Sequence, residues 1–321
     1  MNDQTPRRYK GSLLERAAEQ SQFAAAPQSA PAPRPAPPIP AHAPEGPVIR
    51  RAPEPATPVE PAPAPVSAPE AAARPMASID RQRLRDAGML LPGGPITSLA
   101  EEFRMVKRQL LLTARAVAAG DDAKAADRAR MILVCSAQPD EGKTFCAINL
   151  ALSMAAEKDM EILLVDADFA KPDVLARLGL PAGPGLLDAL SGAVANVEAC
   201  ILETDVPQLT VLPAGTRTNS DTELLASDRA RAILDGLAAA NPRRIVIFDS
   251  PPALAASPAS VLALHVGQVM LVVRADSTSE SDLREAVQLL DGCEHIQLVL
   301  NSVSFQPGGR RFGSYYGEME V

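Results

Sequence analysis

The residues best suited to do chemistry lie in a short polar loop at positions 137–144. An apolar run at 132–135 precedes the loop, the loop ends in Gly142, Lys143 and Thr144, and apolar residues at helical spacing follow it. This order of strand, loop and helix is typical of a P-loop. Loop amides and the helix N-terminus would surround phosphate oxygens, Lys143 would reach the β- and γ-phosphates, and Thr144 would bind Mg²⁺. The alternative is a plain turn between a strand and a helix.

Acidic residues end two other apolar runs. Asp166 and Asp168 close the run at 161–168, and Asp249 closes the run at 244–249. Parallel strands bring their carboxyl ends to the same sheet edge, where ligands bind. The first two acids could hold Mg²⁺-bound water or accept a proton from an attacking hydroxyl, and Asp249 is the expected second Mg²⁺ carboxylate. The alternative is that an acid caps the next helix, as we expect for Asp173.

These side chains need a layered scaffold to position them. Apolar runs recur between segments with helical spacing, at residues 132–135, 161–168, 208–215, 244–252, 269–273 and 297–301. The alternation predicts one doubly wound α/β domain with a mostly parallel sheet over residues 131–301. Asn301 ends the sixth run and could contact adenine through its amide. The residues predicted to bind the nucleotide are Pro139, Asp140, Glu141, Gly142, Lys143, Thr144, Phe145 and Asn301.

A helix is predicted ahead of the first strand. Ser98 would be its N-cap, with Glu101 three residues later completing a capping box. Phe103, Val106, Leu110 and Leu111 form one apolar face, whereas Glu101, Arg104, Lys107 and Arg108 project elsewhere. This charged face would either form ion pairs with a second subunit or remain solvated. Residues 80–91 should form a short helix or turn.

The composition bounds the class of protein. The 321 residues carry a net charge of −8, which argues against a general nucleic-acid-binding surface. No run approaches 18 apolar residues, and the first ten residues lack the apolar core of a signal peptide. The four cysteines lack zinc-site or disulfide spacing, and Cys135 should be a core residue. We therefore expect a cytoplasmic protein whose membrane role, if any, comes through a partner.

The ends of the chain differ in composition from the middle. Residues 1–22 include a possible short helix at 13–20, which could dock a partner or a membrane surface or stay solvated. Residues 23–78 are rich in Pro and Ala, as expected of a disordered linker. Residues 79–304 would form the folded domain. The polar, glycine-rich tail at 305–321 carries Tyr315 and Tyr316, two of the three tyrosines in the chain; the sequence does not indicate whether the third, Tyr9, is modified.

Together these motifs resemble the bacterial tyrosine kinases of exopolysaccharide systems, within the P-loop ATPases that include the ParA and MinD proteins. SAQPDEGKT resembles their Walker A motif, LLVDADFAKP their second acidic motif and IVIFDSPP their Walker B motif. GLLDALSG and LPAGTRTNSDTELLAS match two further blocks. EEFRMVKR is similar to their E-x-x-R-x-x-R oligomerisation motif, with Lys107 in place of arginine. The tail GRRFGSYYG resembles the tails that these kinases phosphorylate, and SLLERAAEQ the short helix of autokinases from exosortase-associated loci.

The resemblance implies an ATP-dependent, Mg²⁺-dependent protein-tyrosine autokinase. Lys143, Asp166 and Asp168 would be catalytic, and Thr144, Asp166 and Asp249 would serve the metal. Tyr315 and Tyr316 would accept phosphate in trans within a homo-oligomeric ring whose interface includes Glu101, Arg104 and Lys107. The kinase would regulate exopolysaccharide synthesis or export through a membrane chain-length protein (a polysaccharide co-polymerase) at the inner face of the plasma membrane, without binding nucleic acid.

Departures from the family pattern keep other functions open. Ala170 stands where the second acidic motif usually has arginine, Pro258 replaces a frequent acid, and the tail has only two tyrosines. A ParA- or MinD-like positioning ATPase is one alternative, although residues 132–142 lack the extra lysine of that group and no C-terminal amphipathic helix follows. Another alternative is a non-catalytic nucleotide-binding regulator, which the presence of Ala170 would indicate. A metabolic enzyme on the same fold is a third.

Overall fold

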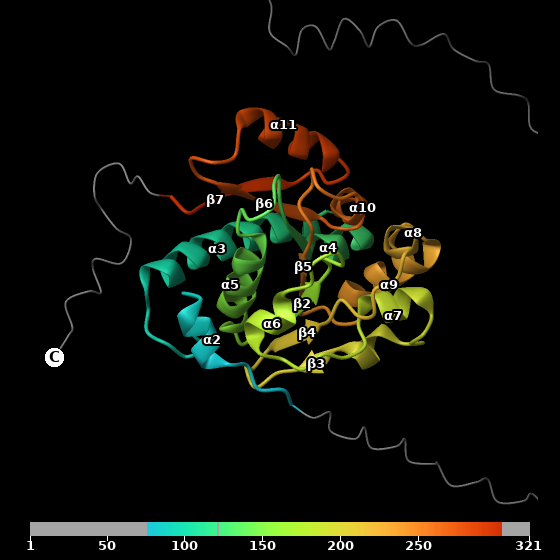
Figure 1. Ribbon diagram of the computed structural model, residues 1–321, viewed down its shortest axis with the longest axis horizontal. Helices are drawn as coiled ribbons and strands as arrows, with labels where there is room; N and C mark the ends of the chain where they lie inside the picture. Colours follow the sequence, from blue (N-terminus) through green and yellow to red (C-terminus); the bar gives the residue numbers. More distant parts are fainter. Residues whose placement is uncertain (1–75, 121, 304–321) are drawn as a thin grey trace, which may run out of the picture. The chain divides into compact units, whose positions relative to one another are not determined.

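A computed structural model describes residues 76–120 and 122–303, and its centre is a seven-stranded sheet (Figure 1). The strand order is β3-β4-β2-β5-β1-β6-β7, and every neighbouring pair is parallel except β3 and β4. The strands are β1 Met131–Ser136, β2 Glu161–Asp166, β3 Leu202–Glu203, β4 Leu209–Leu212, β5 Arg244–Asp249, β6 Gln268–Arg274 and β7 Ile296–Asn301. The predicted α/β sheet is confirmed. The sequence reading missed only β3, because two residues are too short to show an alternating pattern.

Helices cover both faces of the sheet. They are α2 Arg81–Asp86, α3 Ser98–Ala118, α4 Ala123–Ala129, α5 Lys143–Ala155, α6 Val174–Leu178, α7 Leu186–Ser191, the 3₁₀ helix η1 Val197–Cys200, α8 Asp221–Leu225, α9 Asp228–Ala239, α10 Pro258–Ala263 and α11 Glu280–Leu289. One apolar core lies between the sheet and α7–α11, and a second between the sheet and α2, α3, α5 and α6. Leu133 of β1 belongs to the first core and Ile132 to the second. Burial on both faces explains why the strands read as continuous apolar runs.

The strand register brings the predicted functional residues to one edge. Asp166 at the end of β2 is level with Asp249 at the end of β5, and Val134 of β1 is level with Asp249 as well. The loop at 137–142 follows β1, which lies between β5 and β6. The P-loop and both strand-end acids therefore share the carboxyl edge of three central strands, as the sequence predicted.

Helix α3 begins with a different cap from the predicted one. Thr97 is the N-cap residue, and its hydroxyl accepts a hydrogen bond from the Ala100 amide at 3.2 Å. Ser98 is already the first helical residue, so the predicted Ser98 capping box with Glu101 is wrong. Two adjacent hydroxyl residues both suit an N-cap, and the one whose backbone is extended takes the role.

The sequence analysis placed Lys107 on the outward charged face of α3, but the structure places it on the buried face. Its side chain follows the buried series Phe103, Leu110 and Ala114, and the residue is only 8% exposed. The amine donates to the Ser153 carbonyl at 3.1 Å and pairs with the Glu157 carboxylate at 2.7 Å. Lys107 comes four residues after Phe103 and three residues before Leu110, so it shares with them the face of α3 that packs against α5.

The two other residues proposed for a subunit interface, Glu101 and Arg104, remain accessible on the surface of α3. Arg104 pairs with Glu101 one turn away, at 2.5 Å, and the Arg104 side chain is 48% exposed. Of the three residues in the proposed interface, only Glu101 and Arg104 are therefore available for a partner.

Removing the Lys107 amine should destabilise the fold. We expect Lys107→Ala to lower the free energy of unfolding by about 2 kcal/mol, because it removes a buried stem and two hydrogen bonds to the amine. The matched change at the exposed Arg104, Arg104→Ala, should cost no more than about 0.5 kcal/mol. Urea unfolding of both variants measures the difference, and equal effects would contradict the inward placement of Lys107.

The described residues begin at Met76, shortly before the predicted start of the folded domain. Ala77 donates to the Glu203 carbonyl at 2.8 Å and accepts from the Asp205 amide at 3.0 Å, so it extends the sheet beside β3. Arg81 then pairs with Asp205 at 2.6 Å. The predicted helix at 13–20, the Pro/Ala-rich segment up to residue 75 and the tyrosine tail lie outside the described residues. Among helices of the described part, none combines the length and apolar character needed to cross a membrane.

Candidate active site

The loop between β1 and α5 has the shape that a P-loop requires. Gly142 has φ of 96° and immediately precedes α5, and Asp140 at the tip has φ of 63°. A Cβ atom on Gly142 would lie 2.1 Å from the Asn301 side-chain nitrogen, so only glycine fits both the conformation and the space. The 13-residue helix α5 then points its amino terminus at the space above the loop. This end of the helix and the loop amides can bind an anion such as a phosphate.

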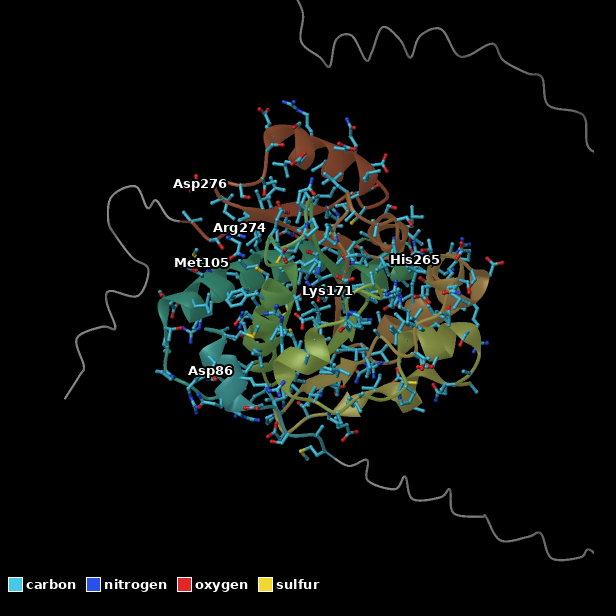
Figure 2. The ribbon with its side chains drawn as sticks, viewed as in Figure 1. Asp86, Met105, Lys171, His265, Arg274 and Asp276 are labelled. Carbon is cyan, nitrogen blue, oxygen red and sulfur yellow. The ribbon has the colours of Figure 1, made fainter. Side chains whose placement is uncertain are left out.

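Side chains from β6 and β7 hold this loop in place. The Glu141 carboxylate is buried and accepts from the Gln138 amide at 3.0 Å and from the Thr278 hydroxyl. Arg274, labelled at the end of β6 in Figure 2, donates to the Asp140 carbonyl at 3.1 Å. Asn301 donates to the Glu141 carbonyl at 2.9 Å. The loop is therefore tied to the ends of two neighbouring strands.

This bracing refines the set of nucleotide-binding residues. The Glu141 carboxylate faces the protein and supports the loop, and the Asn301 amide bonds to the loop backbone, so contact of Asn301 with adenine remains a prediction. Pro139 and Asp140 are exposed at the loop tip, and Phe145, in the first turn of α5, is half-buried against the core. Sequence reasoning did not identify Arg274 and Thr278. The available signal was their position at the end of a buried strand (Arg274) and in the turn that follows it (Thr278), at the same edge as the acids.

Three buried acids surround the P-loop lysine. Asp166, Asp168 and Asp249 are 1%, 4% and 0% exposed. The Lys143 amine pairs with Asp168 at 2.8 Å and lies 3.5 Å from the Thr144 hydroxyl. Burial alone would lower the pKa of Lys143, but the negative charges of Asp249, Asp168 and Asp166 outweigh it and raise that pKa. The amine is therefore charged at neutral pH.

The two strand-end acids have pKa values near neutrality. Burial raises the pKa of Asp249 to about 7, against the lowering effects of the Lys143 charge and the Thr144 hydroxyl. Burial and the neighbouring Asp249 charge raise the pKa of Asp166 to about 7. A carboxyl group with such a pKa can exchange a proton at neutral pH.

One of these acids also caps a helix. Asp166 accepts from the Val174 amide at the start of α6, at 3.1 Å. Asp173 stands at the N-cap position of α6, as the sequence suggested, but its side chain makes no capping hydrogen bond, because its carboxylate pairs with Arg177 at 2.5 Å. The hydrogen bond fixes one oxygen of Asp166, and the other, Oδ1, is buried without a hydrogen-bond partner among the described residues.

The site has acceptor atoms that suit a Mg²⁺ ion. Within the described residues, Asp166 Oδ1 and both Asp249 oxygens are buried and lack a well-formed hydrogen bond. Burying such atoms without a partner is unfavourable, and a cation would satisfy them. No cluster of three or more His, Cys, Asp or Glu side chains in the described part encloses a metal alone. The residues therefore fit a Mg²⁺ ion that takes its other ligands from phosphate and water, with Thr144 and Asp249 as protein ligands.

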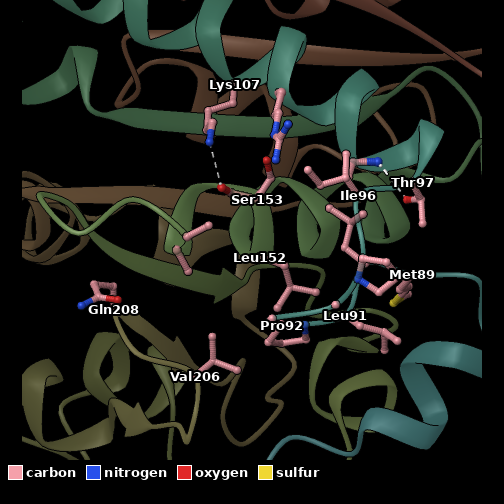
Figure 3. Close-up of a pocket in the computed structure, with 18 of the residues that line it drawn as sticks. Met89, Leu91, Pro92, Ile96, Thr97, Lys107, Leu152, Ser153, Val206 and Gln208 are labelled. Atoms are coloured by element: carbon pink, nitrogen blue, oxygen red, sulfur yellow. Dashed lines mark hydrogen bonds between the residues drawn. The ribbon is translucent and has the colours of Figure 1, made fainter. Parts of the chain in front are cut away.

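A surface groove lies away from the sheet edge that carries the P-loop and the acids. The groove of about 680 Å³ lies between residues 89–97, α3, the end of α5 and residues 206–208 (Figure 3). Its lining includes Met89, Leu91, Ile96 and Leu152 and none of the predicted nucleotide-binding residues. The P-loop and its acids do not open into this groove, so it is not the candidate active site.

Comparison with known proteins identifies a matching family and several similar proteins. The model of the AAA domain family matches residues 129–302. The chain is 30% identical over 192 residues to a putative tyrosine-protein kinase EpsB of Ralstonia nicotianae, covering 58% of this chain and 25% of that protein. It is 26% identical over 226 residues to a putative tyrosine-protein kinase CapB of Staphylococcus aureus, covering 70% and 92%. The match thus spans a quarter of the length of the EpsB protein.

Solved structures share the fold. The crystal structure of the chimerical protein CapA2B2 superposes with a TM-score of 0.57 at 26% identity, covering 71% of this chain and 93% of that one. The kinase domain of the Escherichia coli tyrosine kinase ETK has a TM-score of 0.55 at 24% identity, covering 72% and 92%. The second likeness shows the fold alone. These comparisons agree with the mostly parallel α/β sheet.

Proposed function

The chain belongs to the AAA domain family over residues 129–302, and from this premise we propose that it is an ATP-dependent protein-tyrosine kinase. The observation that carries the proposal is the charged Lys143 held among three buried carboxylates beside a braced P-loop. Relatives with 26–30% identity are described as putative tyrosine-protein kinases, which supports the same activity. Tyr315 and Tyr316 in the tail are the proposed acceptors.

Each residue has a distinct role in the proposed reaction. Lys143 exchanges its Asp168 contact for the β- and γ-phosphates and stabilises charge that develops as the γ-phosphoryl group leaves ADP. Asp166 orients the tyrosine hydroxyl and accepts its proton while the oxygen bonds to the γ-phosphorus. Mg²⁺, when held by Thr144 and Asp249, neutralises phosphate charge. The products are ADP and phosphotyrosine, and most of the acceleration comes from positioning and electrostatics.

The biological setting belongs to the same proposal. Copies of the chain would assemble through Glu101 and Arg104, and each phosphotyrosine would add a charge of about −1.5 to −2 that loosens the assembly by repulsion. A membrane polysaccharide chain-length protein would recruit the kinase to the inner face of the plasma membrane and couple it to exopolysaccharide synthesis. The segment SLLERAAEQ supports a place in an exosortase-associated locus.

Mixing two inactive variants tests transfer between copies. Tyr315→Phe/Tyr316→Phe keeps the catalytic residues but has no acceptors, and Lys143→Met keeps the acceptors but lacks the catalytic cation. We expect phosphate on the Lys143→Met chain only when both variants are incubated together with ATP and Mg²⁺. A mixture without phosphate, beside a wild-type protein that phosphorylates itself, would show transfer within one chain.

One feature favours a second candidate function. Ala170 follows the second acidic motif where related kinases carry arginine, so the chain could bind nucleotide and regulate polysaccharide assembly without transferring phosphate. Isothermal titration with ATP beside a phosphotransfer assay separates the two functions. Tight binding without transfer would establish the regulator.

A further inference from the structure

A single carboxylate fixes the loop that follows β4. Asp188 of α7 accepts from the Gly185 amide at 2.8 Å and from the Thr216 amide at 3.1 Å. Gly215 has φ of 89°, and a Cβ atom there would lie 2.5 Å from the Asp188 carboxylate. The loop therefore follows one path closely around Asp188. Asp188 therefore connects the motif at 185–192 to the motif at 212–227. The proposed reaction assigns no role to either motif.

These hydrogen bonds to Asp188 fix the backbone at Thr216 and so set the position of Arg217, which follows it in the loop. Its guanidinium donates to the Ala170 carbonyl at 3.3 Å, two residues beyond Asp168, the partner of Lys143. Its nearest carboxylate oxygen is on Asp221, at 3.9 Å, and that group already accepts from the Thr218 amide and hydroxyl at 2.8 and 2.7 Å. The Arg217 side chain is 67% exposed. Most of its five N–H donors therefore remain open to a ligand.

The last ten residues of the tail complement this charge, whereas Arg310 and Arg311 precede them. Residues 312–321, FGSYYGEMEV, contain no cation and carry Glu318 and Glu320. In an extended peptide, side chains two residues apart point to the same side. When Tyr316 enters the site, Glu318 therefore faces the same protein surface, roughly 7 Å further along the peptide.

We propose that Arg217 is an acceptor-binding residue that pairs with the carboxylate two positions after the acceptor tyrosine, in the tail of a second copy. The inference rests on the proposed kinase function and specifies its substrate class, a tyrosine followed at the second position by an acid. Asp188 is the positioning residue that holds the loop carrying Arg217. Arg217, on the loop after β4, thus brings a positive charge to the turn that contains Ala170, whose own side chain is only a methyl group.

Binding of a synthetic tail peptide to the full-length protein tests the pairing. A fluorescein-labelled peptide of residues 309–321 is titrated in low salt and followed by fluorescence polarisation. We expect Arg217→Ala to weaken binding about fivefold, the size expected of an exposed ion pair. A peptide with Glu318→Gln should lose the same factor with wild-type protein and nothing further with Arg217→Ala. Salt at about 0.5 M should remove the difference.

Controls separate this pairing from general charge and from folding. Arg284→Ala removes an equally exposed arginine from α11 and should leave peptide binding unchanged. Arg217→Lys should recover part of the affinity, and the unfolding temperature of Arg217→Ala should match that of the wild type.

The outcomes distinguish this inference from the kinase proposal. Independent losses from Arg217→Ala and Glu318→Gln, or no loss from either, would overturn the role of Arg217 even if phosphate is transferred. Coupled losses without phosphate transfer would support the acceptor site and overturn the kinase reaction. The absence of any peptide binding at millimolar protein would overturn the inference.

Discussion

Replacing Lys143 with methionine is expected to reduce phosphoryl transfer at least about a thousandfold. The amine lies among Asp166, Asp168 and Asp249, and these acids raise its pKa, so it is charged whenever nucleotide is bound. Methionine has a similar length and no charge, and it cannot stabilise the negative charge that develops on the phosphates. Transfer of radiolabelled phosphate from ATP to the tail measures the loss.

A lysine elsewhere on the surface provides the control. Lys158→Met, in the exposed turn after α5, changes the net charge equally and should leave the rate within a factor of two. Activity in Lys143→Met above about a tenth of wild type would show that the P-loop cation is not central to the reaction.

Replacing Asp249 with asparagine should stabilise the fold at high pH while it removes activity. Burial raises the pKa of Asp249 to about 7 from an ordinary value of 3.8. As the pH rises, the unfolded chain loses this proton first, so the contribution of Asp249 to stability falls between about pH 4 and pH 7 and is then constant. Asparagine removes that charge. We expect Asp249→Asn to be more stabilising at pH 8 than at pH 5, by about 2 kcal/mol.

Chemical unfolding at the two pH values provides the measurement. Asp159→Asn, a change at an exposed acid near the end of α5, should show no such pH-dependent gain. A destabilising effect of Asp249→Asn at pH 8 would mean that a partner within the protein already stabilises the ionised carboxylate. Phosphoryl transfer measured in the same variant gives the contribution of Asp249 to the reaction, separately from its effect on the free energy of unfolding.

The sequence predicted the site well where a residue ends a strand. Asp166, Asp249 and the P-loop each follow an apolar run, and parallel strands meet at one edge, so their convergence follows from topology alone. The residues that brace the loop were harder to find. Arg274 ends β6 and Thr278 lies in the turn after it, more than 130 residues from the P-loop in the sequence, and their contacts are with backbone and buried groups of the loop.

Lys107 shows a second limit of sequence reasoning. Its charge suggested an outward position, yet its spacing from Phe103 and Leu110 places it on the buried face of α3. A long apolar stem allows lysine to occupy that face when a carbonyl and a carboxylate receive its amine. Here the Ser153 carbonyl and Glu157 fill these roles, and no feature of the local sequence indicates them.

Mass spectrometry of the tail tests the central claim most directly. The full-length protein is incubated with ATP and Mg²⁺, beside Lys143→Met, and the tryptic peptide of residues 312–321 is analysed. The account predicts phosphate on Tyr315 or Tyr316 in the wild type and none in Lys143→Met. A wild-type protein that binds ATP and still carries no phosphotyrosine would contradict the kinase function and leave a nucleotide-binding regulator in its place.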